Sequence, residues 1–184
     1  LIRSRSCSPL SSIFWSRPDR RFSANGVILE ELYSLLIPLH KDRLIVPRSC
    51  VAEVVRFSSR DGIDDEHEWF RGNFDWNGRS VPVISFEALC GLPGSKAGGR
   101  TRVAVFHGLS DTLESGYFGI LTEGFPQLVR VNREVMQLSD RQAWPEDGPV
   151  ICQIRMINEY PLVPDIERIE ALIHSAVTPG QTLA

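Results

Sequence analysis

The residues of this chain whose side chains could act in catalysis or bind a metal ion do not have the sequence spacing that such sites need. Its four histidines are His40, His67, His107 and His174. None belongs to an HExxH pattern, in which two histidines one helical turn apart share a metal ion. No GxSxG sequence frames a serine nucleophile either. We therefore expect no enzymatic activity and no metal ion from these residues.

Two segments approach a ligand-binding motif and fall short of it. Residues 91–96 have the glycines of a phosphate-binding loop, but that motif needs Gly-Lys-Ser/Thr leading into a helix, and here Ser95 precedes Lys96. The acidic run 64–68 lacks the turn glycine of an EF-hand and has no second cluster of ligands beside it. A linker and a solvated acidic loop are the simpler interpretations. We expect no cofactor.

The four cysteines are widely spaced and form no CxxC pair, which disfavours zinc-ribbon and thioredoxin-type sites. With no export signal recognised, we expect reduced thiols in the cytoplasm, packed as small hydrophobic side chains. The residues concerned are Cys7, Cys50, Cys90 and Cys152.

Length and composition are those of one ordinary globular domain or a pseudo-duplicated one. The chain has 184 residues, 42% of them hydrophobic, and a net charge of −3, which provides no general attraction to nucleic acid. Its apolar runs are too short for a transmembrane helix. The first 25 residues carry five arginines, one acid and seven serines. We interpret residues 1–26 as a disordered or non-native leader and residues 178–184 as a loose tail.

The dipeptide Asn77-Gly78 predicts a β-hairpin. It lies between two apolar-rich runs, and both central residues of a type I′ turn need a positive φ, which Asn and Gly tolerate. The second run contains Pro82, which has no N–H for a sheet, so we expect an irregular or edge-like arm. Phe74 and Trp76 lie in the other arm, just before the turn. This geometry favours a small β-barrel that presents a surface.

The rest of the chain is read as many short strands and one solid helix. We expect a strand at residues 35–40, a turn at 41–42 and a returning strand at 43–46. Residues 49–55 are expected to form a short helix or an irregular corner. Residues 86–89 read as one helical turn. Further strands are expected at 101–107, 117–121, 128–131 and 151–157. Asp165 can cap a C-terminal helix whose apolar face is Ile166, Ile169, Leu172 and Ile173. The pattern predicts a mainly β, barrel-like architecture.

Most of the aromatic residues are expected in the core. Trp76 is beside a turn and Phe125 lies between Gly124 and Pro126, so both are candidates for partial exposure as partner anchors. For either residue alone, core or turn packing is the competing interpretation.

Three segments resemble the CheW-like adaptor domain of bacterial chemosensory systems. That family has a Val-x-Glu-hydrophobic-hydrophobic corner, a hairpin with a Leu-Arg-Gly turn before Val-Pro-Val-Ile-Asp-Leu, a Phe-Gly-Leu-Leu-Val-Asp-type strand and a C-terminal helix. The matching segments are VAEVV at 51–55, GNFDWNGRSVPVISF at 72–86 and FGILTE at 118–123. We take residues 31–177 as the CheW-like domain.

The resemblance implies two SH3-like β-barrel subdomains around a shared core, with a groove between them and a C-terminal helix. It implies a non-catalytic adaptor. One surface of the first barrel would dock the regulatory domain of a CheA-type histidine kinase, and the groove would receive the cytoplasmic tip of a methyl-accepting chemoreceptor. The candidate protein-binding residues are Val54, Phe74, Trp76, Asn77, Arg79, Glu123 and Phe125.

The chain departs from the family at the turn. Asn77 stands where the family has the arginine implicated in coupling receptor to kinase, and it lacks that residue's charge and fork-shaped donors. Arg79 is one candidate replacement, although its side chain should point to the opposite face. The chain looks more like the divergent ChpC-type proteins of pilus-associated chemosensory clusters, whose output is twitching motility. The alternative is a β-barrel module that binds a small ligand or single-stranded nucleic acid outside chemosensing.

Overall fold

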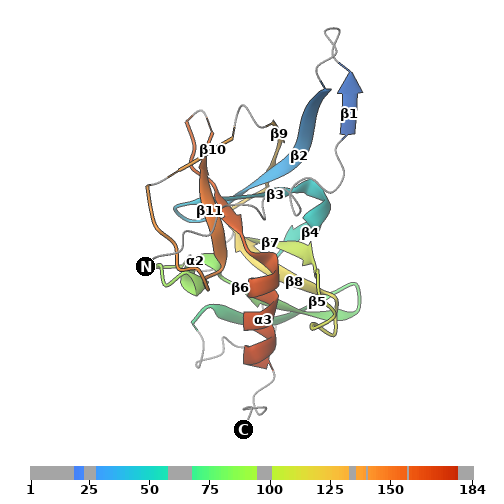
Figure 1. The fold of residues 1–184 in the computed structure, drawn as a ribbon. Helices are drawn as coiled ribbons and strands as arrows, with labels where there is room; N and C mark the ends of the chain where they lie inside the picture. The colour runs from blue at the N-terminus through green and yellow to red at the C-terminus, as the bar shows by residue number, and fades with distance from the viewer. Residues whose placement is uncertain are drawn as a thin grey trace.

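In a computed structural model of the protein, most of the regular structure is β-strand (Figure 1). The strands of the described residues form two sheets, one of seven strands and one of five. Of the segments discussed above, residues 64–67 of the acidic run, residues 95–96 of the glycine-containing segment, the tail 178–184 and most of the leader lie outside the described residues. The structure describes residues 19–22, 28–57, 68–94, 101–132, 136–139, 141–156 and 158–177.

The five-stranded sheet contains all three segments that resemble the adaptor family. Strand β6 is parallel to β8, and the other neighbours are antiparallel. In spatial order its strands are β4 (Val51–Arg56), β7 (Arg102–His107), β8 (Tyr117–Thr122), β6 (Arg79–Ile84) and β5 (Phe70–Trp76).

The seven-stranded sheet is built around β2, which pairs with β1, β3 and β9. In Figure 1 this long strand runs from its pairing with β1 down into the body of the protein. Strand β12 lies between β11 and β3, and it is parallel to β3. The strands are β1 (Asp19–Phe22), β2 (Ile28–Pro38), β3 (Arg43–Pro47), β9 (Gln127–Val131), β10 (Gln137–Leu138), β11 (Val150–Arg155) and β12 (Leu162–Pro164).

One core joins the two sheets. It contains Ile37 and Leu44 from the seven-stranded sheet, Phe106 and Ile120 from the five-stranded sheet, and Ile169 from the C-terminal helix, all of them fully buried. Each sheet also encloses a smaller apolar cluster of its own. Burying one apolar face of each sheet against a shared core is what makes the two sheets a single folding unit. The prediction of a mainly β protein with two barrel-like subdomains and a C-terminal helix is confirmed.

The hairpin at Asn77-Gly78 is confirmed, with φ of 53° and 75° at the two turn residues and with Trp76 opposite Arg79. An edge-like second arm is wrong, because β6 pairs with β5 on one side and with β8 on the other. The irregularity lies in the other arm: from Phe70 to Asn73 strand β5 advances three residues while β6 advances two, so the β-bulge is in β5 and not in the arm that contains Pro82. Pro82 lies opposite Asn73 of β5, and the pairing of β6 with β8 begins one residue later, at Val83. Its missing N–H therefore does not interrupt the pairing with β8.

The expectation of a short helix or corner at 49–55 is only partly right. A single 3₁₀ turn, η1 (Arg48–Cys50), comes first, and strand β4 follows from Val51. The strand pairs with β7, with a register shift between Val51 and Glu53. Its three valines favour a strand, and pairing with β7 selects it over helix. The two short strands β10 and β12 were not predicted, because strands of two and three residues carry no periodicity to read.

The helices expected at 86–89 and after Asp165 are confirmed. Helix α2 (Phe86–Leu89) is one turn, and α3 (Ile166–Val177) is the C-terminal helix. The Asp165 carboxylate accepts a hydrogen bond from the backbone N–H of Arg168 at 2.9 Å, which is the predicted N-cap. The expected apolar face of α3 packs inward, with its three isoleucines buried. No helix of the described residues is long and apolar enough to cross a membrane.

Residues 19–22 of the predicted leader form β1, which pairs with residues 28–31 of β2. The division of the chain into leader, domain and tail stays a prediction.

Candidate functional site

The candidate residues lie at two opposite ends of the five-stranded sheet and in its interior. Trp76, Asn77 and Arg79 are at the end where β6 and β8 begin, and Glu123 and Phe125 follow the end of β8. Strand β8 has six residues, so at roughly 3.3 Å per residue the two groups are on the order of 17 Å apart. We call the first group's surroundings the hairpin end (Glu53, Trp76, Asn77, Arg79 and Tyr117) and the second group's surroundings the junction end (His40, Lys41, Glu87, Glu123 and Phe125).

The hairpin end closes the five-stranded sheet on itself. The indole N–H of Trp76 donates a hydrogen bond to the carboxylate of Glu53 at 2.9 Å. Trp76 belongs to β5 and Glu53 to β4, and these strands are the two edges of the sheet. A bond between the edges means that the sheet curls into a barrel, which leaves fewer unpaired edge groups exposed. Trp76 is therefore half-buried. It is partly exposed and also packed beside the turn, so both of the interpretations left open by the sequence apply in part.

The rings and cations of the hairpin end form one continuous cluster. The Trp76 and Tyr117 rings meet edge to face with centroids 4.8 Å apart, and the His107 ring centroid lies 5.3 Å from that of Tyr117. The guanidinium carbon of Arg79 is 5.4 Å from the Tyr117 centroid, and Arg79 donates a hydrogen bond to the Ser115 carbonyl at 3.1 Å. The exposed Arg79 is thus directed along the start of β8.

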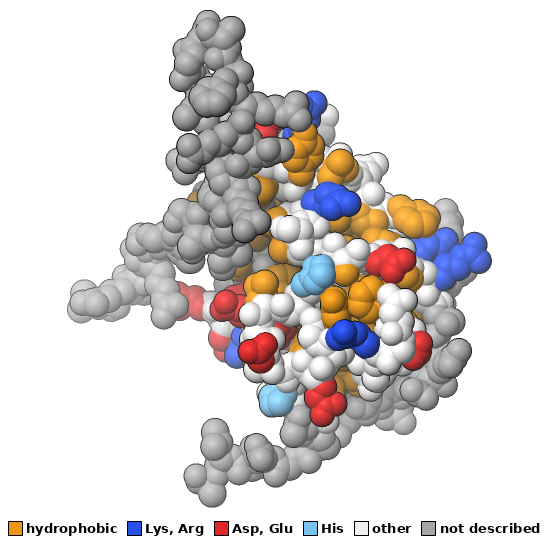
Figure 2. Space-filling view, turned by 90° about the vertical axis from the view of Figure 1, so that its right-hand side faces the viewer, with side chains coloured by type: hydrophobic (Ala, Val, Ile, Leu, Met, Phe, Trp, Pro, Cys, Tyr) orange, Lys and Arg blue, Asp and Glu red, His pale blue; other side chains and the backbone are white. Residues whose placement is uncertain are grey.

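Figure 2 looks onto the side of the molecule where β5 and β8 lie in Figure 1. On this face hydrophobic side chains are interleaved with charges of both signs and with histidine. Such a mixture is ordinary for a protein surface, so the individual side chains have to identify a contact.

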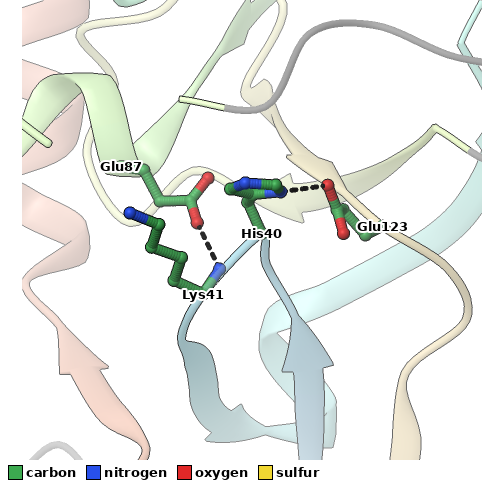
Figure 3. Close-up of polar contacts among 4 residues, drawn as sticks. All are labelled: His40, Lys41, Glu87 and Glu123. Atoms are coloured by element: carbon green, nitrogen blue, oxygen red, sulfur yellow. Dashed lines mark hydrogen bonds and ion pairs between the residues drawn. The ribbon is translucent and has the colours of Figure 1, made fainter. Parts of the chain in front are cut away.

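The junction end ties the two sheets together (Figure 3). The His40 ring nitrogen Nδ1 lies 2.8 Å from the Glu123 carboxylate, and the Glu123 N–H donates to the Pro38 carbonyl at 2.9 Å. Beside them, the buried Glu87 carboxylate accepts a hydrogen bond from the Lys41 backbone N–H at 3.0 Å. His40 and Lys41 belong to the β2–β3 turn, whereas Glu87 and Glu123 flank the five-stranded sheet. The turn is therefore held by both sides of the junction.

Phe125 is the most exposed large hydrophobic residue at this end, with 66% of its surface accessible. This confirms its predicted exposure. The guanidinium carbon of Arg102 lies 5.3 Å from its ring centroid, which is cation–π range. Leu128 of strand β9, three residues further on, is 57% exposed. Together they place apolar surface next to the junction of the two sheets.

The two remaining candidates face inward. Phe74 is buried in the apolar cluster of the five-stranded sheet, and Val54 packs against the shared core. A role for them in partner binding stays a prediction. Sequence reasoning missed two sets of residues: Glu53, His107 and Tyr117 near the hairpin end, and His40, Lys41 and Glu87 at the junction end. Glu53 was inside a segment already singled out, but nothing in the sequence connects it to Trp76.

A pocket of about 350 Å³ opens between α2, the 144–150 segment and α3. Its walls are mostly apolar, and Cys90 and Asp147 are the residues with ionisable side chains among those that line it. Burial, and then the negative charges of Asp42 and Glu87, raise the pKa of the Cys90 thiol to about 12. The thiol is therefore protonated at neutral pH, and it is a poor nucleophile. Among the described residues, no group of three or more His, Cys, Asp or Glu side chains is placed to hold a metal ion.

The sequence matches a known family over most of its length. The model of the CheW-like domain matches residues 34–170, from the middle of β2 into α3. The chain belongs to the CheW-like domain family. This confirms the resemblance carried by residues 51–55, 72–86 and 118–123.

The fold agrees with this membership. Among solved structures, the CheW-like chain is similar to the scaffolding protein TtCheW from Thermoanaerobacter tengcongensis, with a TM-score of 0.61 and 12% sequence identity. The similarity covers 80% of this chain and 91% of that one. At this identity the similarity concerns the fold. No curated protein matches the sequence at a significant level.

Proposed function

We propose that this CheW-like protein is a non-catalytic, cytoplasmic adaptor that couples methyl-accepting chemoreceptors to a CheA-type histidine kinase in bacterial chemotaxis or twitching motility. Family membership supports an adaptor role, and the structurally similar TtCheW is described as a scaffolding protein. The observation that carries the proposal is the presence of two separate exposed surfaces at opposite ends of one sheet. An adaptor needs two such surfaces because it holds two partners at once.

The hairpin end is the proposed docking surface for the regulatory domain of the kinase. It offers Trp76 and Tyr117 in edge-to-face contact and the exposed Arg79 beside them. Aromatic and arginine side chains are the residue types that carry most of the energy at protein interfaces. Their contacts with one another hold them in place before binding, which lowers the entropic cost of forming the complex.

The junction end is the proposed site for the cytoplasmic tip of the receptor. Phe125 and Leu128 provide apolar surface there, and Arg102 and the His40–Glu123 pair provide polar groups around it. A receptor bound at this end would contact the place where the two sheets are tied together. A change in that tie is a physical route by which receptor binding can influence a kinase held at the hairpin end.

Asn77 supports a divergent subtype within the proposal. It is exposed and occupies the turn with φ of 53°, where the family has its arginine. Arg79 is engaged with Ser115 and Tyr117, so it presents its charge along β8 rather than at the turn. We therefore propose a ChpC-type, pilus-associated adaptor in which Trp76 and Arg79 carry the contact.

The test is retention on two immobilised partners, a CheA-type regulatory domain and a receptor cytoplasmic tip from the same organism. We expect both to retain the protein. Trp76→Ala should lower the affinity for the kinase domain by roughly tenfold or more, because anchor residues at interfaces contribute about 2 kcal/mol. Phe125→Ala should do the same for the receptor tip alone.

Each variant serves as the control for the other, because both remove a large side chain and they act on different partners. Trp76→Phe keeps an aromatic ring but loses the indole N–H that binds Glu53, so it should retain more kinase binding than Trp76→Ala. If wild-type protein is retained by neither partner, the adaptor function is wrong.

A further inference from the structure

A buried carboxylate on the C-terminal helix holds the loop between β7 and β8. Glu170 of α3 is fully buried. Its two oxygens accept hydrogen bonds from the backbone N–H of Leu109, from the backbone N–H of Ser110 at 2.9 Å and from the Ser110 hydroxyl. All three donors belong to one short stretch of loop. A buried carboxylate is costly unless it is hydrogen-bonded, so these contacts account for its position.

The loop is shaped to bring its backbone against this carboxylate. A Cβ at Gly108 would lie 3.2 Å from the Glu170 oxygen Oε1 and 3.0 Å from the Gly116 carbonyl oxygen, so a side chain there would be crowded against both. The Gly108 N–H donates to that carbonyl at 2.8 Å, and the Gly116 N–H donates to the Leu113 carbonyl at 2.9 Å. Leu113 itself is buried in the shared core. The loop is therefore anchored at its base and at its middle.

Leu109 is exposed in spite of this anchoring. Its backbone is bound to Glu170, yet 53% of its surface is accessible. A single exposed leucine is ordinary, but this one stands on a loop that reaches the hairpin end. At the far side of the same loop, the Ser115 carbonyl accepts the hydrogen bond from Arg79, and the chain continues into Tyr117. Leu109 is thus part of a hydrogen-bonded loop that is continuous with the proposed kinase-docking surface.

We propose that Leu109 is an apolar anchor of the hairpin-end surface for the kinase regulatory domain and that Glu170 is the positioning residue that holds it ready to bind. The proposal rests on the adaptor function proposed above. A loop whose backbone is fixed before binding loses less conformational entropy in the complex than a mobile loop. The C-terminal helix thereby contributes to a docking surface that it does not itself form.

The anchor is tested by measuring the affinity of the full chain for the immobilised regulatory domain. Leu109→Ser should weaken binding by roughly tenfold, as expected for an interface anchor. The matched control is Leu138→Ser on β10, because Leu138 is exposed to the same degree, 54%, and lies in the other sheet. It should bind as wild type. Receptor-tip binding should be unchanged in both variants.

The positioning role is tested by a double-mutant cycle. In Glu170→Gln an amide NH₂ group replaces one of the two acceptor oxygens, so the loop loses at least one of its hydrogen bonds to α3. The affinity for the kinase domain should then fall by roughly three- to tenfold. Combined with Leu109→Ser it should cause little further loss, because the anchor that Glu170 holds is already gone. Ser110→Ala removes one donor and should act in the same direction more weakly, which keeps the test open if Glu170→Gln does not fold.

The outcomes separate the two proposals. Failure of wild-type protein to bind the kinase domain contradicts the adaptor function itself. If wild type binds and Leu109→Ser is indistinguishable from Leu138→Ser, the anchor is overturned while the adaptor stands. If the losses from Leu109→Ser and Glu170→Gln simply add, Glu170 acts through general stability, and its positioning role is wrong.

Discussion

The hairpin end and the junction end of the five-stranded sheet are closed in different ways. At the hairpin end a two-residue turn reverses the chain, and the bond from Trp76 to Glu53 joins two strands of the same sheet. At the junction end the contacts cross from one sheet to the other, through the buried Glu87 carboxylate and through His40 and Glu123. The hairpin end is thus held by contacts within one sheet, whereas the junction end is a contact between the two sheets.

This difference determines what each end is able to do. At the hairpin end Asn77 and Arg79 are exposed, Trp76 and Tyr117 are half-buried, and the contacts of these side chains stay within the five-stranded sheet. The junction end contains a polar group whose loss leaves a backbone donor without its partner at the boundary of two sheets. A partner at the hairpin end therefore meets a fixed surface, whereas a partner at the junction end acts on the contact that joins the subdomains.

The largest effect is expected for Glu87→Ala. The substitution removes the buried acceptor of the Lys41 N–H at the sheet boundary, and we expect a loss of about 2 kcal/mol in the free energy of unfolding. Urea denaturation followed by tryptophan fluorescence measures it. Glu87→Gln keeps an acceptor oxygen and should lose clearly less. Equal losses for the two variants would mean that packing, and not this hydrogen bond, holds the junction.

A smaller effect is expected at the hairpin end for Asn77→Ala. Alanine is strained at φ of 53°, a conformation that asparagine tolerates, so we expect a loss of about 1 kcal/mol in the free energy of unfolding. The same urea titration measures it, and Asn77→Gly serves as the control because glycine accepts this φ without strain. If the alanine variant is as stable as wild type, the turn does not contribute to closing this end.

The smallest effect is expected for His40→Gln. The side chains of His40 and Glu123 are 47% and 37% exposed, so solvent screens their contact and its loss should cost about 0.5 kcal/mol or less. Thermal unfolding should shift by only a few degrees at most. A loss as large as that of Glu87→Ala would overturn the view that the buried carboxylate dominates the junction end.

Local structure was predictable where a few adjacent residues decide it. The Asn77-Gly78 turn, the Asp165 cap and the apolar face of α3 follow from φ preferences, hydrogen bonding and helical periodicity within short stretches. The strand β4 was not distinguished from a corner, because its partner β7 begins at Arg102, well beyond the reach of any local pattern that starts at Val51. The exposure of Phe125 was predicted from its neighbours alone.

The functional surfaces were predictable only in part. The sequence alone predicts Trp76, Asn77, Arg79 and Phe125 as candidates, since each lies at or near a turn. Their separation into two ends was not predicted, because it depends on the parallel pairing of β6 with β8. Glu170 gave no signal, since a glutamate in a helix is ordinarily solvated.

The sequence by itself determined the class of fold, the family and the positions of the turns, because alternation, turn chemistry and motif order are properties of neighbouring residues. Only the tertiary structure decided which of those turns meet. Pairing of distant strands placed Glu53 against Trp76 and Glu87 against the Lys41 N–H, and packing of α3 against the sheet buried Glu170 beneath Leu109. Such contacts join residues from 23 to 61 positions apart, a separation at which no local preference operates.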